Sequence, residues 1–405
     1  MSEEPESVAP ELAPATLHAP VVLVDSPEDF LRALDDLESG EGPLAIDAER
    51  ASGFRYTNQA YLVQLFRTGC ANYLIDPLGV PDLGAISTRL GDLEWIIHAA
   101  HQDLSCLREV GINPTTLFDT ELGARLAGLP RVGLQGVVED LMGMSLAKEH
   151  SAADWSTRPL PDSWLTYAAL DVELLPRVRD HIHALLLEQG KMDIAREEFA
   201  AALLAPEPTP RAEPWRRLSG LHQVRGGRAL AIAKSLWEAR DAYARETNTA
   251  PGRLVPDRSV VAAVLANPSS KSELAGLKAF HGRASRQQLD RWWQAIEAGR
   301  TATELPEARA ASEGPPPPRI WADRNPEAAQ RFTRAKEALS ELSEEITIPS
   351  ENILTPDFLR RVCWAPPQPL SEEGIDGALA ELGARPWQRV AVASILLGAF
   401  VSKDQ

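Results

Sequence analysis

Two proline-rich segments constrain this chain more than any other feature of its sequence. The first is LAPEPTPRAEP at 204–214, and the second is TATELPEARAASEGPPPPR at 301–319, which contains four consecutive prolines. Because proline has no backbone N–H and a fixed φ, neither segment is able to continue a helix or a central strand. We therefore predict that both are linkers. The 405 residues then divide into units at 20–203, 215–300 and 320–402.

The N-terminal 19 residues, MSEEPESVAPELAPATLHA, are acidic and rich in proline and alanine. They lack the basic region and apolar run of a signal peptide, so we predict a disordered leader at 1–19 and a cytoplasmic protein. No stretch of 18 apolar residues occurs, which argues against a membrane span. The cysteines Cys70, Cys106 and Cys363 are far apart and odd in number. That spacing fits a reducing compartment and neither a disulfide framework nor a thiolate zinc site.

The unit at 20–203 has the pattern of an α/β domain. Strands are predicted at VVLVDS (21–26), PLAIDAE (43–49), the hairpin AYLVQLF–RTGC–ANYLIDP, and EWIIHAA (94–100). Ser26, followed by Asp29, predicts the start of a helix at PEDFLRALDDLES. From about 117 to 200, apolar residues recur every three or four positions, which predicts helices throughout. We expect a mixed sheet of three or four strands with helices, followed by two all-helical units.

Two short patterns place acidic residues at the ends of elements. Asp47 and Glu49 end the strand PLAIDAE, and alternation puts both side chains on one face. Two like charges held close together are costly without a cation, although a D-x-E after a strand is by itself a weak signal. Asp103 in HAAHQDLSCL lies near a helix start, where an acid is also a routine N-terminal stabiliser.

A third pattern pairs a tyrosine with an aspartate on one helix. In WLTYAALDVELL, Tyr167 and Asp171 are four residues apart, so their side chains share one face. Much of this helix is apolar, and two polar groups on such a face need partners. A mutually satisfied buried pair is the alternative to a functional site.

The order D-x-E, D, Y-x3-D resembles the DEDD exonuclease superfamily, and the sequence between these motifs is similar to the ribonuclease D family. AYLVQL, LFDTELGARLAG and KEHSAADWSTRPLP carry this likeness. Its individual positions are Phe118, Asp119, Thr120, Lys148, Asp154, Trp155, Arg158, Pro159, Leu160, Ala168 and Val172. Position 166 is Thr where the DEDDh branch carries His, so Tyr167 indicates the DEDDy branch. Arg50 is a departure, because an aromatic or aliphatic residue is expected there.

This resemblance implies an RNase H-like α/β exonuclease domain that removes 5′-mononucleotides from the 3′ end of RNA. Asp47, Glu49, Asp103 and Asp171 would hold two divalent cations, Mg²⁺ or Mn²⁺, and Tyr167 would orient the attacking water. The expected substrates are single-stranded 3′ ends, above all those of tRNA precursors and small stable RNAs. No GxxxxGK[ST] motif occurs, so no nucleotide cofactor or helicase activity is expected. We expect a monomer.

The net charge of −17 conceals an asymmetry between the units. Residues 1–200 contain 14 Lys/Arg and 33 Asp/Glu, a balance of −19, whereas residues 211–300 contain 16 and 8, a balance of +8. The basic segment indicates either a polyanion partner or only a solvated helix surface. Residues 227–277 resemble the HRDC domain, which favours nucleic acid. Trp292 and Trp293 are interpreted as stacking on bases or as packing between helices.

The unit at 320–402 resembles the C-terminal, HRDC-like domain of actinobacterial ribonuclease D proteins. We expect it to pack on the other domains or to complete an RNA-guiding ring. Two alternatives to an exoribonuclease stay open. One is a DEDDy exonuclease that prefers DNA, since contact with the 2′-OH decides that preference. The other is a non-catalytic RNA-binding scaffold, although all five functional positions are filled.

Overall fold

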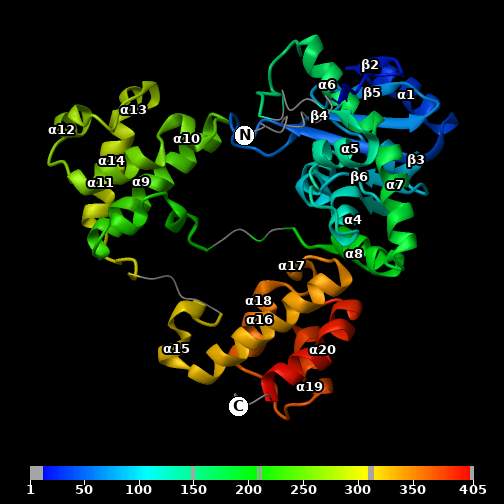
Figure 1. Cartoon of the computed structure of the whole chain (residues 1–405). Helices are drawn as coiled ribbons and strands as arrows, with labels where there is room; N and C mark the ends of the chain where they lie inside the picture. Colours follow the sequence, from blue (N-terminus) through cyan, green and yellow to red (C-terminus); the bar gives the residue numbers. More distant parts are fainter. Residues whose placement is uncertain are drawn as a thin grey trace, which may run out of the picture.

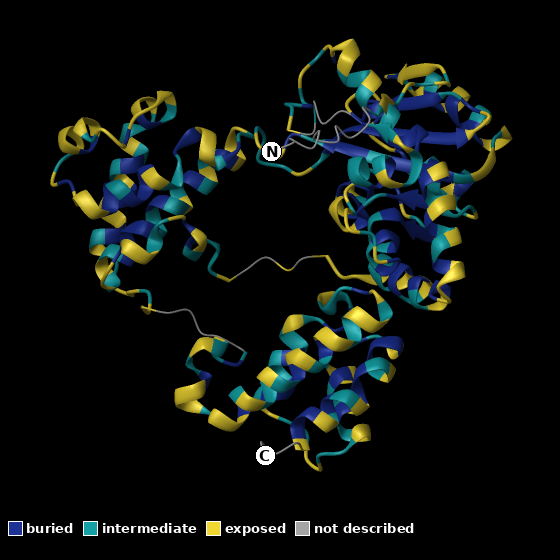
Figure 2. Ribbon diagram, in the orientation of Figure 1, coloured by how far each residue is buried: buried dark blue, intermediate teal, exposed yellow. Residues whose placement is uncertain are grey.

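The computed structural model describes residues 12–146, 150, 152–207, 209, 212–308 and 314–401. Figure 1 shows three domains at the corners of a triangle, and Figure 2 shows that each has a buried interior. Lys148 and residues 1–11 lie outside the described residues. Within the two proline-rich segments, residues 205–207, 209, 212–213, 302–308 and 314–317 form no helix or strand.

The first domain is built on strands with helices around them. Its strands are β1 (Ala13–Pro14), β2 (Val21–Val24), β3 (Glu41–Arg50), β4 (Ala60–Thr68), β5 (Asn72–Ile75), β6 (Trp95–Ile97), β7 (Leu117–Asp119) and β8 (Met144–Ser145). Its helices are α1 (Pro27–Ser39), α2 (Gly84–Leu90), η1 (Ala100–Gln102), α3 (Leu104–Glu109), α4 (Thr120–Leu126), α5 (Leu134–Met142), α6 (Asp162–Glu173), α7 (Leu175–Glu188) and α8 (Met192–Leu204).

Six of these strands form one mixed sheet in the order β2-β5-β4-β3-β6-β7. Strand β4 is antiparallel to both neighbours, and the remaining pairs are parallel. This confirms the predicted mixed α/β class, but the sheet has more strands than predicted. The prediction of helix throughout 117–200 was wrong at β7, which pairs with β6, and at β8, which pairs with β1. A segment of two or three residues is too short for its periodicity to separate a strand from a helix.

The central strand β3 presents its two faces to different layers. Leu44, Ile46 and Ala48 enter the main core, together with residues of α1. The alternate residues face the other side, where Ala45 and Ala51 pack in clusters that include residues of α6. Asp47 and Glu49 share this second face because side chains alternate along a strand. Helix α6, which lies over β3, β4 and β5, is therefore opposite both acids.

The predicted disordered leader was wrong for residues 12–19. Strand β1 pairs in parallel with β8. The backbone N–H of His18 donates to Glu173 Oε1 at 2.7 Å, and that of Ala19 donates to Glu173 Oε2 at 3.2 Å. Glu173 is buried, and a buried carboxylate needs such donors. Composition alone does not reveal a partner that lies more than 150 residues away.

The middle domain is all-helical, as predicted. It consists of η2 (Pro214–Arg217), η3 (Leu221–Gln223), α9 (Gly227–Glu246), α10 (Pro251–Leu254), α11 (Asp257–Ala266), α12 (Lys271–Gly276), α13 (Arg283–Gln287) and α14 (Leu289–Thr301). Its core is a separate cluster that contains Trp215 and Trp292. Trp292 is 1% exposed, so this indole packs between helices and offers no face to a base.

The C-terminal domain is also helical. It consists of η4 (Pro318–Ile320), α15 (Trp321–Arg324), α16 (Pro326–Ile346), α17 (Ser350–Ile353), α18 (Pro356–Trp364), α19 (Glu372–Glu381) and α20 (Pro386–Val401). Among the described residues, no helix combines the length and apolar character that crossing a membrane would require.

The C-terminal domain packs directly on the first domain. Trp387 Nε1 donates to Glu198 Oε1 at 2.6 Å, and Arg385 pairs with the same carboxylate. Lys191 Nζ donates to Thr347 Oγ1 at 2.9 Å. The buried apolar residues of both domains form one continuous cluster. The two domains therefore share a core, whereas the middle domain keeps its own.

Candidate active site

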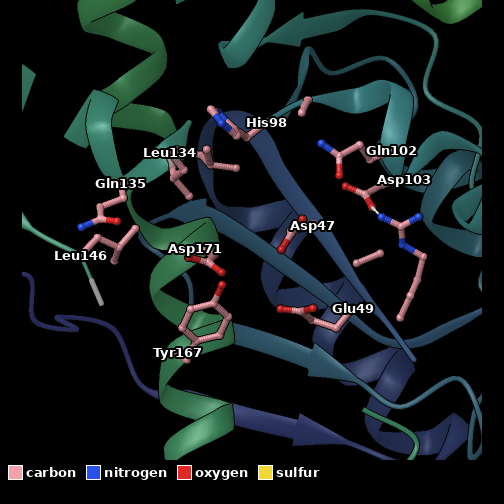
Figure 3. Close-up of a pocket in the computed structure, with 14 residues that line it drawn as sticks. Asp47, Glu49, His98, Gln102, Asp103, Leu134, Gln135, Leu146, Tyr167 and Asp171 are labelled. Carbon is pink, nitrogen blue, oxygen red and sulfur yellow. Dashed lines mark ion pairs between the residues drawn. The ribbon is translucent and has the colours of Figure 1, made fainter. Parts of the chain in front are cut away.

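The five residues singled out by the sequence lie around one pocket. Its volume is about 350 Å³ (Figure 3). The lining residues are Asp47, Ala48, Glu49, Arg50, His98, Ala99, Gln102, Asp103, Leu134, Gln135, Leu146, Tyr167, Asp171 and Leu175. The acids come from three separate elements, because Asp47 and Glu49 end β3, Asp103 precedes α3, and Asp171 projects from α6.

Asp103 is positioned by a buried carboxylate on a neighbouring strand. Asp119 accepts hydrogen bonds from the backbone N–H groups of Ala99 at 3.1 Å and Ala100 at 2.9 Å. Ala99 has a φ of 61°, a left-handed conformation that costs energy for any residue with a Cβ. The same Asp119 carboxylate caps α4, as it accepts from Glu121 N at 3.0 Å. Asp119 thus holds the turn that leads into Asp103.

Helix α6 is anchored to the sheet by the segment before it. Arg158 donates from Nε to Asp76 Oδ2 at 2.6 Å and from a terminal nitrogen to Asp76 Oδ1 at 2.7 Å. It also donates to the backbone oxygen of Tyr61 at 2.8 Å. Trp155 is fully buried against Trp164, with 5.1 Å between the ring centroids. Trp155 and Arg158 are two of the positions at which the sequence resembles the ribonuclease D family. Their contacts fix where α6 begins.

Three carboxylates converge closely enough to share a cation. One carboxylate oxygen from each of Asp47, Glu49 and Asp171 lies within 4.8 Å of the others. Glu49 is 9% exposed and Asp171 is 7% exposed. Burial, followed by the charges of Asp47, Asp171 and Asp103, raises the pKa of Glu49 to about 10. Such a cluster is unfavourable unless protons or a cation balance its charge.

Asp103 lies beyond Asp47 as seen from Asp171, as Figure 3 shows. It is 5% exposed, and burial together with the charge of Asp47 raises its pKa well above the usual range. Its nearest cation is Arg50, whose terminal nitrogen lies 3.3 Å from Asp103 Oδ1. Burial likewise raises the pKa of Asp171. The donor set consists of hard oxygen ligands, which suit Mg²⁺ or Mn²⁺, so the residues present fit the cations that the resemblance implies.

Tyr167 lies one helical turn before Asp171, with its hydroxyl toward that carboxylate (Figure 3). Burial, with added contributions from the charges of Asp171 and Glu49, raises the pKa of Tyr167 above its ordinary value. The phenol therefore stays protonated at neutral pH. It is able to donate a hydrogen bond or to orient a water.

His98 and Gln135 also line the pocket, although neither was singled out from the sequence. His98 lies between β6 and the turn before Asp103, and its Nδ1 is 2.9 Å from Thr120 Oγ1. Burial lowers the pKa of His98 to about 4, so the ring is neutral at pH 7. Gln135 comes from α5. His98 comes directly after the buried strand β6, and this position in the sequence could have marked it as a candidate site residue. Nothing in the sequence around Gln135 marks it in the same way.

Comparisons with known proteins agree with this geometry. A family model described as 3'-5' exonuclease matches residues 21–187, the HRDC domain model matches 229–296, and one described as 3' to 5' exonuclease C-terminal domain matches 314–400. A ribonuclease D from Acidiphilium cryptum is 33% identical over 313 residues, which cover 73% of this chain and 77% of that protein.

Two solved structures share the architecture. A protein from Bifidobacterium adolescentis superposes with a TM-score of 0.86 at 35% identity, covering 95% of this chain and 100% of its own. The Escherichia coli RNase D structure superposes with a TM-score of 0.67 at 24% identity, covering 94% and 98%, and shows the same fold. The DEDD exonucleases use divalent metals, and an acidic cluster is present here. The chain therefore belongs to the ribonuclease D family of 3′–5′ exoribonucleases.

Proposed function

We propose that this protein shortens single-stranded 3′ ends of RNA by releasing 5′-mononucleotides at the pocket around Asp47, Glu49, Asp103 and Asp171. The observation that carries the proposal is the convergence of three carboxylates within 4.8 Å beside a fourth acid and a tyrosine. Two Mg²⁺ or Mn²⁺ ions held there would neutralise the charge that develops on the attacking and leaving oxygens of a phosphodiester.

The roles of the side chains follow from their positions. Asp47 belongs to the trio and also lies beside Asp103, so it is the acid best placed to serve both cations. Tyr167 borders the pocket with a neutral hydroxyl, so it would hold the attacking water in line. The apolar Leu134, Leu146 and Leu175 line the same pocket, and they would limit the access of bulk water to the reacting phosphate.

The proposed substrate class follows from the charges of the domains and from the activity of a relative. The first domain is acidic, so attraction for a polyanion must come from the cations and from the basic middle domain. The Escherichia coli RNase D is an exoribonuclease involved in structured RNA processing. We propose 3′ trimming of tRNA precursors and other small stable RNAs as the cellular task.

The direct test uses full-length protein with Mg²⁺ and matched RNA and DNA oligonucleotides labelled at the 5′ end. The proposal expects a ladder that shortens from the 3′ end of RNA and releases 5′-mononucleotides. Faster shortening of DNA would identify a DNA-preferring exonuclease instead. No shortening of either would indicate a binding scaffold.

The control is Asp103→Asn, which removes one charge from a like-charged cluster and should leave the fold intact. Turnover should fall by at least about 10²–10³-fold, the cost of losing a group that stabilises charge in the transition state. RNA degradation at the wild-type rate in this variant would disprove the site.

A further inference from the structure

The segment at residues 12–19 is attached at both ends to elements that line the pocket. At its first end, strand β1 pairs in parallel with β8, and the backbone N–H of Ala15 donates to the backbone oxygen of Ser145 at 2.9 Å. The residue after Ser145 is Leu146, which is buried and lines the pocket. Residues 12–15 therefore hold the strand that leads to Leu146.

At its second end, the segment is bound by the carboxylate of Glu173, the last residue of α6. Oε1 of Glu173 accepts from the backbone N–H of His18 at 2.7 Å, and Oε2 accepts from the N–H of Ala19 at 3.2 Å. Oε2 also accepts from Asn72 Nδ2 of β5 at 2.6 Å. Glu173 is 8% exposed. One buried carboxylate thus joins the N-terminal segment, the sheet and the end of α6.

Glu173 lies on the helix that carries two of the candidate site residues. Tyr167 and Asp171 share one face of α6, whereas residues two positions apart on a helix do not face each other. Glu173 therefore anchors the side of α6 that is turned away from Asp171. Between the two attachments, Leu17 packs on the cluster that contains Ala168 of the same helix. These contacts oppose rotation and sliding of α6 over the sheet.

We propose that Glu173 is a positioning residue: by binding the segment 12–19, it fixes α6 against the strand that leads to Leu146. This inference rests on the proposed function. Glu173 is not among the described residues that line the pocket, so it acts through Tyr167 and Asp171 and not on the substrate. Displacing a reacting group by about 1 Å can cost roughly 10²-fold in rate, so turnover depends on this attachment.

The test is Glu173→Gln in the full-length protein, a change that keeps the shape of the side chain. The amide has an NH₂ group in place of one oxygen, so an N–H of His18 or Ala19 then faces another donor. Amide hydrogen exchange in residues 144–146 and in α6 should rise by roughly 10-fold. Single-turnover RNA cleavage at saturating RNA and Mg²⁺ should fall by about 10–100-fold, with the Kd for RNA unchanged.

A double-mutant cycle with Tyr167→Phe separates positioning from a general loss of stability. If Glu173 acts through α6, the two changes should be coupled, and the double variant should lose less than the product of the single losses in rate. Independent losses would identify Glu173 as a structural residue only.

A second variant, Ala15→Pro, attacks the other end of the segment. It removes the N–H that donates to Ser145 and leaves Glu173 intact, so it tests the proposal even if Glu173→Gln does not fold. Hydrogen exchange in residues 144–146 should rise and the cleavage rate should fall, again with the Kd for RNA unchanged.

The matched control is Glu188→Gln, which makes the same change at the exposed last residue of α7. It should leave exchange and cleavage unchanged, and circular dichroism melts check that each variant is folded. Unchanged exchange in α6 after Glu173→Gln, or an unchanged cleavage rate in either test variant, would overturn the proposal. A wild type that cleaves no RNA would instead reject the proposed function, and the exchange data would then decide whether Glu173 holds α6.

Discussion

The side-chain oxygen of Asn248 in the middle domain accepts a hydrogen bond from the backbone N–H of Tyr56 in the first domain, at 3.1 Å. It also accepts from the N–H of Thr57 at 3.2 Å. These residues belong to the loop 51–59, which starts directly after Arg50. The middle domain therefore holds the segment that continues from the acidic end of β3.

Further contacts reinforce this attachment. Arg253 donates to the backbone oxygen of Gly53 at 2.7 Å, and its guanidinium lies 3.7 Å from the ring centroid of Phe54. Gly53 and Phe54 line a second hollow of about 230 Å³ that also includes Glu49. The basic middle domain thus holds residues that form a wall beside Glu49, in addition to any contact with RNA.

Asn248→Ala should loosen the loop 51–59 without unfolding either domain. Each lost hydrogen bond contributes about 1 kcal/mol, so amide hydrogen exchange in the loop should rise by roughly 10-fold or more. Exchange measured by mass spectrometry tests this, and Asn113→Ala at an exposed turn is the matched control. Unaltered exchange in 51–59 would mean that the other contacts hold the loop without Asn248.

Tyr167→Phe should impair turnover without abolishing it. The ring still packs near Trp155 and the carboxylates are untouched, but the hydroxyl that we propose to orient the attacking water is gone. The rate at saturating Mg²⁺ should fall by about 10²–10⁴-fold, the range for a positioned proton-transfer group. Single-turnover RNA cleavage and Mn²⁺ affinity are measured together. A fall in metal affinity with an unchanged rate would show that Tyr167 is structural.

His98 should make stability fall in mild acid. Its pKa is about 4 in the folded protein, against about 6.5 in the unfolded chain. Below pH 6.5 the unfolded chain binds the proton first, so the free energy of unfolding should decrease as the pH drops toward 4. The loss should be roughly 2 kcal/mol, less than the whole shift implies because the ring is partly exposed to the pocket.

Comparison with His98→Gln isolates this effect, because every other titrating group is common to both proteins. Denaturant unfolding in a chelator at several pH values gives the difference in free energy of unfolding. That difference should shrink as the pH falls from 6.5 to 4.5. A difference that stays constant would contradict a neutral His98 in the folded protein.

The basic middle domain should set the salt dependence of RNA binding. Arg225 and Arg283 are exposed there, and Arg225 lines a hollow of about 760 Å³. If both contact phosphates, the double change to Gln should flatten the log–log salt slope by up to about 1.4 for a single strand. Arg324→Gln in the C-terminal domain is the control. Equal slopes would identify the positive charge as a solvated surface only.

The sequence alone determined the elements that carry the five candidate site residues. The N-cap at Ser26, the strand before Asp47 and the helix that carries Tyr167 and Asp171 all depend on neighbouring residues. Side-chain periodicity and helix capping depend on residues only a few positions apart, so these features can be predicted from the sequence. The family resemblance then linked acids that lie far apart in the sequence.

Tertiary structure decided what depends on distant contacts. The pairing of Arg50 with Asp103 joins residues 53 positions apart, and the attachment of Asn248 to Tyr56 joins residues 192 positions apart. The first and C-terminal domains share a core, and Trp387 donates a hydrogen bond to Glu198 across their interface. The sequence near either residue does not predict this contact. Such contacts arise only when sheet, helices and domains take their relative positions, because no periodic pattern in a sequence specifies which distant surface will cover a given side chain.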